Sequence, residues 1–169
     1  MRNEAGYEAL RGGRVSIRGA RYFVTVCTHA RRQGLNESTV ATELKEQLAS
    51  MDRENIMITH AAVIMPDHLH VLFTLSGERT IGQVVARAKF GTRLTLSTAG
   101  LRWQGNYFEH RLRSTDPLED VVRYLYINPY AAGLVASTEP YPHFWTDRTV
   151  ASWFNPTLNH HRPFPGWLP

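Results

Sequence analysis

The chain has 169 residues, a length that fits one domain with a core of its own. Apolar residues make up 43% of it and charged residues 20%, which excludes an intrinsically disordered protein. Its apolar runs fall well short of the roughly 20 residues that a membrane helix needs, and its N-terminal segment lacks the apolar stretch of a signal peptide. The single cysteine, Cys27, excludes an internal disulfide and a zinc site built of cysteines. These features predict a globular protein in the cytoplasm.

The charge indicates the kind of partner. The formal net charge is +4 with a pI near 9.5, and Lys45 and Lys89 are the two lysines, so most basic residues are arginines. The planar guanidinium group suits phosphate oxygens and base edges. A small, basic, arginine-rich domain therefore favours a nucleic-acid partner. When charge is the only observation, an arginine-rich surface that reflects a GC-rich genome explains it equally well.

The first half of the chain predicts three strands and one helix. Residues 1–20 scatter arginines among glycines and predict a basic, flexible arm. The β-branched and aromatic run Tyr22–Thr28 predicts a strand, and apolar residues at helical spacing between Ser38 and Glu54 predict a helix. Two strands are then expected, at Ile56–Met65 and His68–Leu75, and the short break between them predicts a tight hairpin.

A second helix is expected to begin at Thr80, where Gln83 completes a capping box, and to run as far as Leu96. Tyr107–Arg113 alternates apolar and polar side chains and predicts a fourth strand. The order strand, helix, strand, strand, helix, strand, with a further helix, fits an α+β fold. We therefore expect a ferredoxin-like antiparallel sheet with helices packed on one face.

The further helix has the clearest local signals. Asp116 is expected to cap it, Pro117 fits its first turn, and Glu119 would complete a capping box. Pro129 is expected to discourage its continuation. Beyond residue 133 the chain is rich in proline, tryptophan and histidine and predicts an irregular tail. Four aromatic residues are expected to pack this tail on the domain: Phe144, Trp145, Trp153 and Trp167.

Two histidines open the predicted third strand. Because side chains alternate along a strand, His68 and His70 project to one face while Leu69 enters the other. Adjacent imidazoles on a rigid strand form half of a site for a divalent cation. Taken alone, the pair fits two half-exposed strand histidines at least as well. Asp67 either supports His68 from behind or simply forms the turn.

A tyrosine and an amide lie one turn apart on the predicted last helix. Tyr124 and Asn128 are four residues apart, so they share one strip at the edge of the apolar stripe, whereas Tyr126 lies on the other flank. They are candidates for a site that faces the sheet. Taken alone, this segment fits better a tyrosine that packs at the helix edge and an asparagine that ends the helix.

Three motifs in order resemble one family. The run at residues 66–70 resembles the HUH motif, histidine–hydrophobic–histidine, of single-tyrosine HUH endonucleases. Residues 124–129 with 132–135 resemble the tyrosine helix of the REP-associated tyrosine transposase branch, an insertion-sequence transposase-like group, and residues 103–113 resemble the segment before that helix. The resemblance covers about residues 21–135. The motif departs at Leu125, Tyr130 and the segment 141–147, none of them at the proposed site, so the target sequence is not carried over.

The resemblance implies roles for four residues. It makes His68, His70 and Asn128 ligands of Mg²⁺ or Mn²⁺ and makes Tyr124 the nucleophile. The implied activity is that of a DNA transposase, which binds a DNA hairpin and nicks and rejoins the adjoining single strand through a 5′-phosphotyrosine link. For DNA contacts, eight basic residues are candidates, although a solvated surface explains each of them equally well: Arg14, Arg18, Arg87, Lys89, Arg93, Arg111, Arg113 and Arg123.

The expected organisation is a basic arm (1–20), a catalytic domain (21–135) and a C-terminal tail (136–169). The expected partners are single-stranded DNA and hairpins, with no membrane, and the protein is expected to be a monomer or a homodimer. Two alternatives stay open: a non-catalytic, domesticated nucleic-acid-binding module, and a nickase similar to HUH replication initiators. The short chain with no helicase or second-tyrosine segment disfavours the nickase. The intact set of two histidines, tyrosine and asparagine favours an enzyme over a pure binder.

Overall fold

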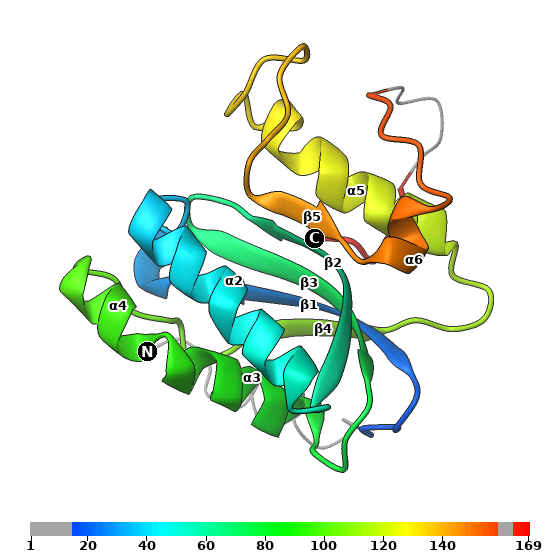
Figure 1. Cartoon of the computed structure of the whole chain (residues 1–169), viewed down its shortest axis with the longest axis horizontal. Coiled ribbons are helices and arrows are strands. Elements are labelled where there is room, and N and C mark those ends of the chain that lie inside the picture. Colours follow the sequence, from blue (N-terminus) through cyan, green and yellow to red (C-terminus); the bar gives the residue numbers. More distant parts are fainter. Residues whose placement is uncertain (1–14, 159–163) are drawn as a thin grey trace, which may run out of the picture.

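Five antiparallel strands form the sheet that organises this chain, shown by the computed structural model in Figure 1. The structure describes residues 15–158 and 164–169. In chain order the elements are β1 (Arg21–Cys27), η1 (His29–Arg31), α2 (Ser38–Arg53), β2 (Met57–Ile64), β3 (His68–Leu75), α3 (Ile81–Gly91), α4 (Arg93–Thr98), β4 (Phe108–Arg111), α5 (Leu118–Ala131), β5 (Phe144–Thr146) and α6 (Arg148–Ala151). The strand order is β4-β1-β3-β2-β5.

The first four strands confirm the predicted ferredoxin-like topology. β1 and β3 lie side by side in the centre, with β4 outside β1 and β2 outside β3. The tight hairpin between β2 and β3 is also confirmed, because the Met65 N–H donates to the carbonyl of His68 at 2.8 Å. The register places Cys27 of β1 opposite His68 and Thr25 opposite His70.

One face of the sheet is covered by α2, α3 and α4, as Figure 1 shows. Alternate side chains of β1 and β3 enter this core together with the apolar stripe of α2. The predicted capping box of Thr80 and Gln83 is present. The predicted second helix is interrupted at Thr92, which bends the chain into α3 and α4 because its hydroxyl donates to the Ala88 carbonyl at 2.9 Å.

The opposite face of the sheet is covered by α5. Val121, Val122 and Leu125 of this helix are fully buried against Phe23 and Leu72 of the central strands. These three belong to the apolar stripe predicted from the sequence, and they fix which side of α5 faces the sheet. The remaining side chains of α5 are thereby placed at the border between this second core and the surface.

Both predicted boundaries of α5 are wrong. Pro117, not Asp116, is the N-cap residue, and the Asp116 carboxylate instead accepts from the Arg113 N–H and from the His110 ring. The capping box expected from Glu119 therefore does not form. Pro129 lies inside the helix, which continues to Ala131 and is followed by the C-cap Ala132 and the left-handed Gly133 (φ 69°).

The glycine explains this ending better than the proline. The Leu134 N–H donates to the Pro129 carbonyl and the Gly133 N–H to the Tyr130 carbonyl, which is the pattern of a Schellman C-cap. Proline removes one N–H but leaves its own carbonyl available as an acceptor. The helix consequently continues through Pro129 until the glycine reverses the chain.

Residues 136–158 add two short elements within an otherwise irregular run. β5 pairs with the outer edge of β2, and α6 follows with its N-terminus capped by Asp147. The sequence did not predict these two elements. Across the described residues, no helix is both long and apolar enough to span a membrane.

Candidate active site

His68 and His70 lie at the start of β3 on the side of the sheet that faces α5. Their ring centroids are 4.5 Å apart, and His70 also stacks on Phe23 of β1 at 5.2 Å. His70 is 2% exposed, and the His68 side chain is 13% exposed. The strand alternation expected from the sequence therefore places both rings on one face. Both rings are largely buried, so they are not the half-exposed strand histidines of the alternative interpretation.

Each imidazole is held by a hydrogen bond to its Nδ1 atom. The Nδ1 of His70 lies 2.7 Å from the hydroxyl of Thr25, its partner across β1, and the Nδ1 of His68 lies 2.6 Å from Asp67. A carboxylate can only accept, so Nδ1 of His68 carries the proton and Nε2 keeps its lone pair. Nε2 of His70 is buried without a hydrogen-bond partner. Of the two roles considered for Asp67, its contact fits support of His68 from behind.

Burial also keeps these imidazoles neutral. It lowers the pKa of His70 well below the usual value, and the neighbouring His68 and Arg31 add to this effect. Burial lowers the pKa of His68 as well, although the Asp67 carboxylate opposes the change. A neutral imidazole retains the lone pair that a metal ion binds.

Tyr124 on α5 approaches the histidine pair from the opposite layer. Its ring centroid lies 5.6 Å from that of His70 and 6.1 Å from that of Phe23. Burial raises the pKa of the Tyr124 phenol, and the side chain of Asn128 opposes the rise. The amide nitrogen of Asn128 is itself buried without a well-formed hydrogen bond. The structure thus places Tyr124 beside His70, which contacts His68, and places Asn128 beside Tyr124.

Tyr126 lies on the other flank of α5, as expected. Its ring packs against Tyr130, Phe144 and Phe154, at 5.3, 5.3 and 5.7 Å between centroids. Burial, with the Tyr130 hydroxyl, raises the pKa of Tyr126 to about 12. The geometry therefore separates the two tyrosines: only the first contacts the histidines.

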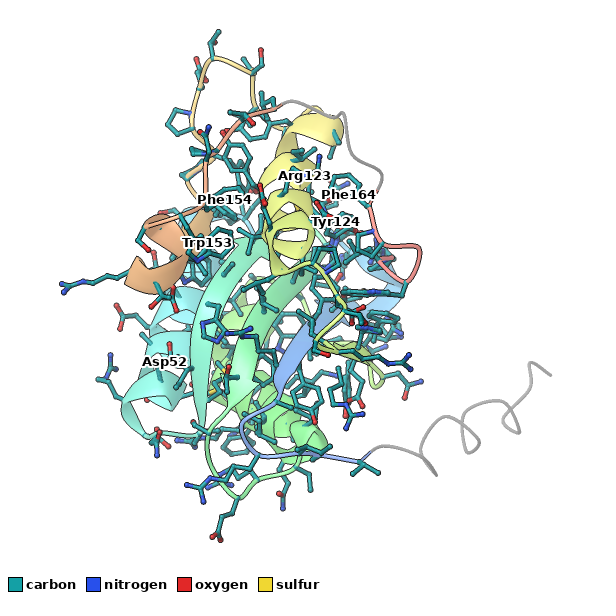
Figure 2. The ribbon with its side chains drawn as sticks, turned by 90° about the vertical axis from the view of Figure 1, so that its right-hand side faces the viewer. Asp52, Arg123, Tyr124, Trp153, Phe154 and Phe164 are labelled. Carbon is teal, nitrogen blue, oxygen red and sulfur yellow. The ribbon has the colours of Figure 1, made fainter. Side chains whose placement is uncertain are left out.

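The segment 164–169 lies over Tyr124. The Tyr124 hydroxyl donates to the backbone oxygen of Pro169 at 2.5 Å, and the ring of Phe164 lies 5.4 Å from that of Tyr124. Trp167 stacks on His110 at 3.7 Å between centroids and packs edge-on against Phe23. Figure 2 shows Phe164 beside Tyr124 and Arg123. The sequence indicated only that aromatic residues would pack the tail on the domain.

The tail aromatics do not share one environment. Trp167 and Phe144 pack on the core below α5, whereas Trp145 packs on the core of the other face. Trp153 stays 42% exposed. The expectation that all four anchor the tail is therefore wrong for Trp153, which follows the one-turn helix α6 at the surface.

Arg31 is a site residue that the sequence did not reveal. Its Nε lies 2.8 Å from Asp67, the partner of His68, and its Nη1 donates to the Sγ of Cys27 at 2.8 Å. Ala30 and Arg31 both have φ of 55°, a left-handed conformation that is costly for residues with a side chain. This backbone turns the guanidinium toward the histidines, and no local sequence signal marks it.

The basic residues expected to contact DNA fall into three groups. Arg18, Arg111 and Arg113 are exposed, and Arg93 stacks over Phe90 at 3.9 Å. Three others already bind within the chain. These are Arg87 with Glu54, Lys89 with backbone carbonyls, and Arg123, which is 8% exposed, with Asp120. Arg14 lies outside the described residues, as does most of the expected N-terminal arm.

Comparisons with known proteins place the chain in a family. Residues 16–127 match the family described as transposase IS200 like. The REP-associated tyrosine transposase of Escherichia coli strain K12 is 29% identical over 141 residues, which cover 82% of this chain and 83% of that protein.

Within the described residues, no three histidine, cysteine, aspartate or glutamate side chains cluster to hold a metal. The candidate ligand set therefore depends on the asparagine.

Solved structures agree with this placement. A REP-associated tyrosine transposase bound to a REP hairpin matches with a TM-score of 0.69 and 28% identity, covering 85% of this chain and 86% of that one. A candidate transposase from Deinococcus radiodurans matches in fold, with a TM-score of 0.50 and 22% identity, over 73% of this chain and 97% of that one. The predicted fold class and the family resemblance are confirmed. This chain belongs to the IS200-like transposase family, whose members are enzymes that act on DNA.

Proposed function

We propose that this chain is a DNA transposase that binds a DNA hairpin and cleaves and rejoins the adjoining single strand through a 5′-phosphotyrosine at Tyr124. The observation that carries the proposal is the approach of the Tyr124 ring to 5.6 Å from the ring of His70 within one chain. The hairpin bound by the structural relative and the family match support the choice of DNA partner.

A divalent cation, Mg²⁺ or Mn²⁺, fits the donor set. Nε2 of His70 and the amide nitrogen of Asn128 are buried without partners, a costly arrangement that a bound cation would relieve. The oxygen and nitrogen of an asparagine amide exchange places by a simple rotation, so Asn128 can present its oxygen. His68 offers the third donor through Nε2. When bound, the cation would supply Lewis-acid polarisation of the scissile phosphate.

The chain's own residues perform the remaining chemistry. In the first step the Tyr124 oxygen forms a bond to phosphorus and the bond from phosphorus to the 3′ oxygen breaks. The proton released by the phenol is balanced by one taken up by the leaving 3′-hydroxyl. Because a phenol has a pKa of about 10, it is a better leaving group than an alcohol. A 3′-hydroxyl can therefore displace the tyrosine later and restore the phosphodiester without ATP.

Covalent capture of DNA tests the proposal. The protein is incubated with Mn²⁺ and a library of 3′-labelled hairpins that carry single-stranded flanks, and labelled protein is separated on a denaturing gel. We expect an adduct with the unaltered chain and with Tyr126→Phe, which serves as the matched control. We expect none with Tyr124→Phe, with His70→Ala, or when EDTA replaces Mn²⁺.

The result separates the alternatives. An adduct that persists in Tyr124→Phe would show that another residue is the nucleophile. Hairpin binding without any adduct, in the unaltered chain and in a chain that ends before Phe164, would leave a non-catalytic binding protein.

A further inference from the structure

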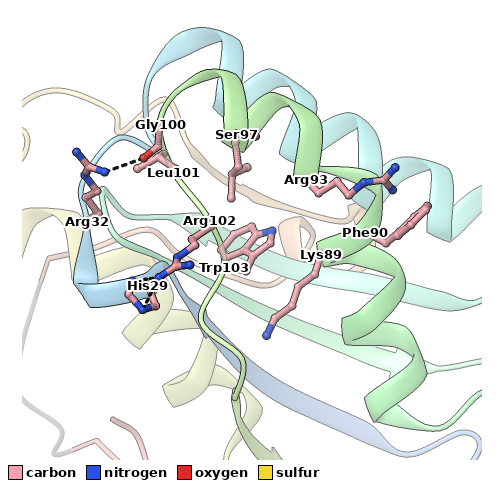
Figure 3. A pocket seen from close by; sticks show the side chains of 11 residues that line it. His29, Arg32, Lys89, Phe90, Arg93, Ser97, Gly100, Leu101, Arg102 and Trp103 are labelled. Atoms are coloured by element: carbon pink, nitrogen blue, oxygen red, sulfur yellow. Dashed lines mark hydrogen bonds between the residues drawn. The ribbon is translucent and has the colours of Figure 1, made fainter.

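A hollow lies on the face of the sheet opposite Tyr124. It has a volume of about 700 Å³ and is enclosed by η1, the C-terminal end of α3, helix α4 and residues 100–103 (Figure 3). A cavity of this size lies within the range of small-molecule binding sites, which are about 300–1,000 Å³. None of the residues described for Tyr124 and its histidine partners lines it, so it is a separate site.

The lining of this hollow is basic. Arg32, Lys89, Arg93 and Arg102 contribute to it, and the described residues that line it include no aspartate or glutamate. Lys89 is already used in the fold, because its Nζ donates to the carbonyls of Gln104, Gly105 and Asn106. The arginines carry the charge that a ligand would meet. The lining therefore complements an anion.

Two of these arginines are positioned by groups that leave most donors available. Arg102 contacts the ring of His29 through Nη2, and Arg32 donates one bond to the Gly100 carbonyl at 3.0 Å. A guanidinium has five N–H donors. Several donors on each side chain are thus free of these contacts, and such donors suit the oxygens of a phosphate.

Flat side chains complete the lining. Phe90 is 61% exposed and its ring carries the guanidinium of Arg93 at 3.9 Å, which forms a stacked platform at the mouth. Trp103 lies deeper, and its orientation is fixed because Nε1 donates to the Thr92 hydroxyl at 2.9 Å. Aromatic faces beside arginines are the usual platforms for unpaired bases.

The turn η1 connects this hollow to the candidate active site. His29 lines the hollow, and two residues later Arg31 pairs with Asp67, which holds His68. Trp103 forms a β-bridge with Thr28, directly before this turn. Both sites therefore open at the same end of the central strands, on opposite faces, with one turn of the chain between them.

We infer that this hollow binds one unpaired nucleotide of the DNA strand that the protein processes, with its base against an aromatic side chain of the lining, Phe90 or Trp103, and its phosphate on the arginines of the lining. The inference rests on the proposed function for the identity of the strand. A strand anchored here reaches the histidine pair by crossing η1. The hollow would thus set which phosphodiester arrives at Tyr124.

Equilibrium binding tests this inference without relying on catalysis. The probes are fluorescein-labelled dT12 and a blunt DNA stem-loop of the same charge. The test variant is the double substitution Arg93→Gln with Arg102→Gln, and a second variant is Phe90→Leu. The matched control, Arg53→Gln with Arg148→Gln, removes the same charge at exposed positions outside the hollow.

We expect the arginine variant to bind dT12 about tenfold or more weakly, and Phe90→Leu roughly fivefold or more weakly, since one stacked base contributes that much or more. Stem-loop affinity and the control should change less than twofold. The slope of log affinity against log salt for dT12 should fall by about 0.7 for each phosphate that the variant no longer binds. With 5-iododeoxyuridine in the probe, ultraviolet crosslinks should map to Phe90 or Trp103.

Four outcomes would overturn the inference. These are unchanged dT12 affinity in the arginine variant, an equal loss of affinity in the control variant, an equal loss for stem-loop and dT12, or dT12 binding too weak to measure in the unaltered chain. Adduct formation at Tyr124 is scored separately. Selective loss of dT12 binding without any adduct would refute the proposed function and leave the nucleotide site standing, whereas an adduct with unchanged dT12 binding would do the reverse.

Discussion

Removal of residues 164–169 should increase the rate at which Tyr124 is captured by DNA. In the structure the hydroxyl of Tyr124, the proposed nucleophile, donates to the backbone oxygen of Pro169, and the Phe164 ring lies against the Tyr124 ring. A phosphate cannot approach the tyrosine while this segment is in place. The segment must therefore leave before the first chemical step, and its closed position reduces the competent fraction of the protein.

The contacts of this segment set the magnitude. One hydrogen bond contributes about 1 kcal/mol, and the ring contacts of Phe164 with Tyr124 and of Trp167 with His110 and Phe23 contribute about 1 kcal/mol each. Their sum is roughly 4 kcal/mol, to which burial of apolar surface adds and from which the conformational entropy regained by the released chain subtracts. The indole N–H of Trp167 is also buried without a hydrogen-bond partner, which lowers the free energy that holds the segment 164–169 in place.

A net closing free energy of about 1.4–2.8 kcal/mol corresponds to a competent fraction of roughly one part in ten to one in a hundred. We therefore expect the truncated chain to form adduct about 10- to 100-fold faster at subsaturating DNA. The assay is the initial rate of labelled adduct with Mn²⁺. Trp167→Ala should give part of this gain, and Trp153→Ala, an exposed tryptophan outside the cover, should give none.

An unchanged or lower adduct rate in the truncated chain would refute this reasoning, provided that the chain keeps the circular dichroism spectrum and cooperative melting of the full chain. Loss of the adduct in the truncated Tyr124→Phe variant is the control for the nucleophile. A rate gain that persists at saturating DNA would also contradict it, because mass action from the ligand should then displace the segment in the full chain.

Three further predictions follow from other contacts. Thr25→Val removes the hydroxyl that holds Nδ1 of His70 and should weaken Mn²⁺ binding about 10- to 100-fold in calorimetry without unfolding the chain. His60→Ala leaves the carboxylate of Asp147 without its ring partner and should lower the free energy of unfolding by about 1–3 kcal/mol in urea titration at pH 7. Burial raises the pKa of Asp52 above its value in the unfolded chain, so ionisation of this carboxyl lowers the stability of the fold as pH rises. Asp52→Asn should therefore raise the melting temperature at pH 7 relative to the unaltered chain. This gain should vanish near pH 3, where the carboxyl is protonated in both states.

The elements that sequence predicts well are those whose signals are local. The apolar spacing in α2, the alternation in β3 and the capping box of α3 each depend on residues within a few positions of one another, and the structure confirms them. Proximity of His70 and Tyr124 was different, because 54 positions separate them and the family resemblance alone suggested the contact. Periodicity could place each residue on its element but could not bring the two elements together.

The features that were missed depend on contacts between distant segments or on unusual backbone. Arg31 reaches Asp67 only because two consecutive residues adopt left-handed angles, which neither alanine nor arginine favours by itself. Pro169 meets Tyr124 across 45 positions through a segment without periodicity. The Pro129 error has another cause, since the proline signal was weighed without the glycine four residues later.

The same contacts indicate which part of the site moves. α5 holds Tyr124 on the sheet through Val121, Val122 and Leu125, each 0% exposed. Truncation of a buried leucine such as Leu125 to alanine typically costs about 2–5 kcal/mol. Shifting the whole helix would disturb all three at once and would cost several times the closing free energy of the segment 164–169. The histidine pair is held in turn by Thr25 on the neighbouring strand and by Asp67 at the hairpin. Access of a phosphate to Tyr124 is therefore controlled by the covering segment, while the tyrosine and the histidines keep the positions that the fold gives them.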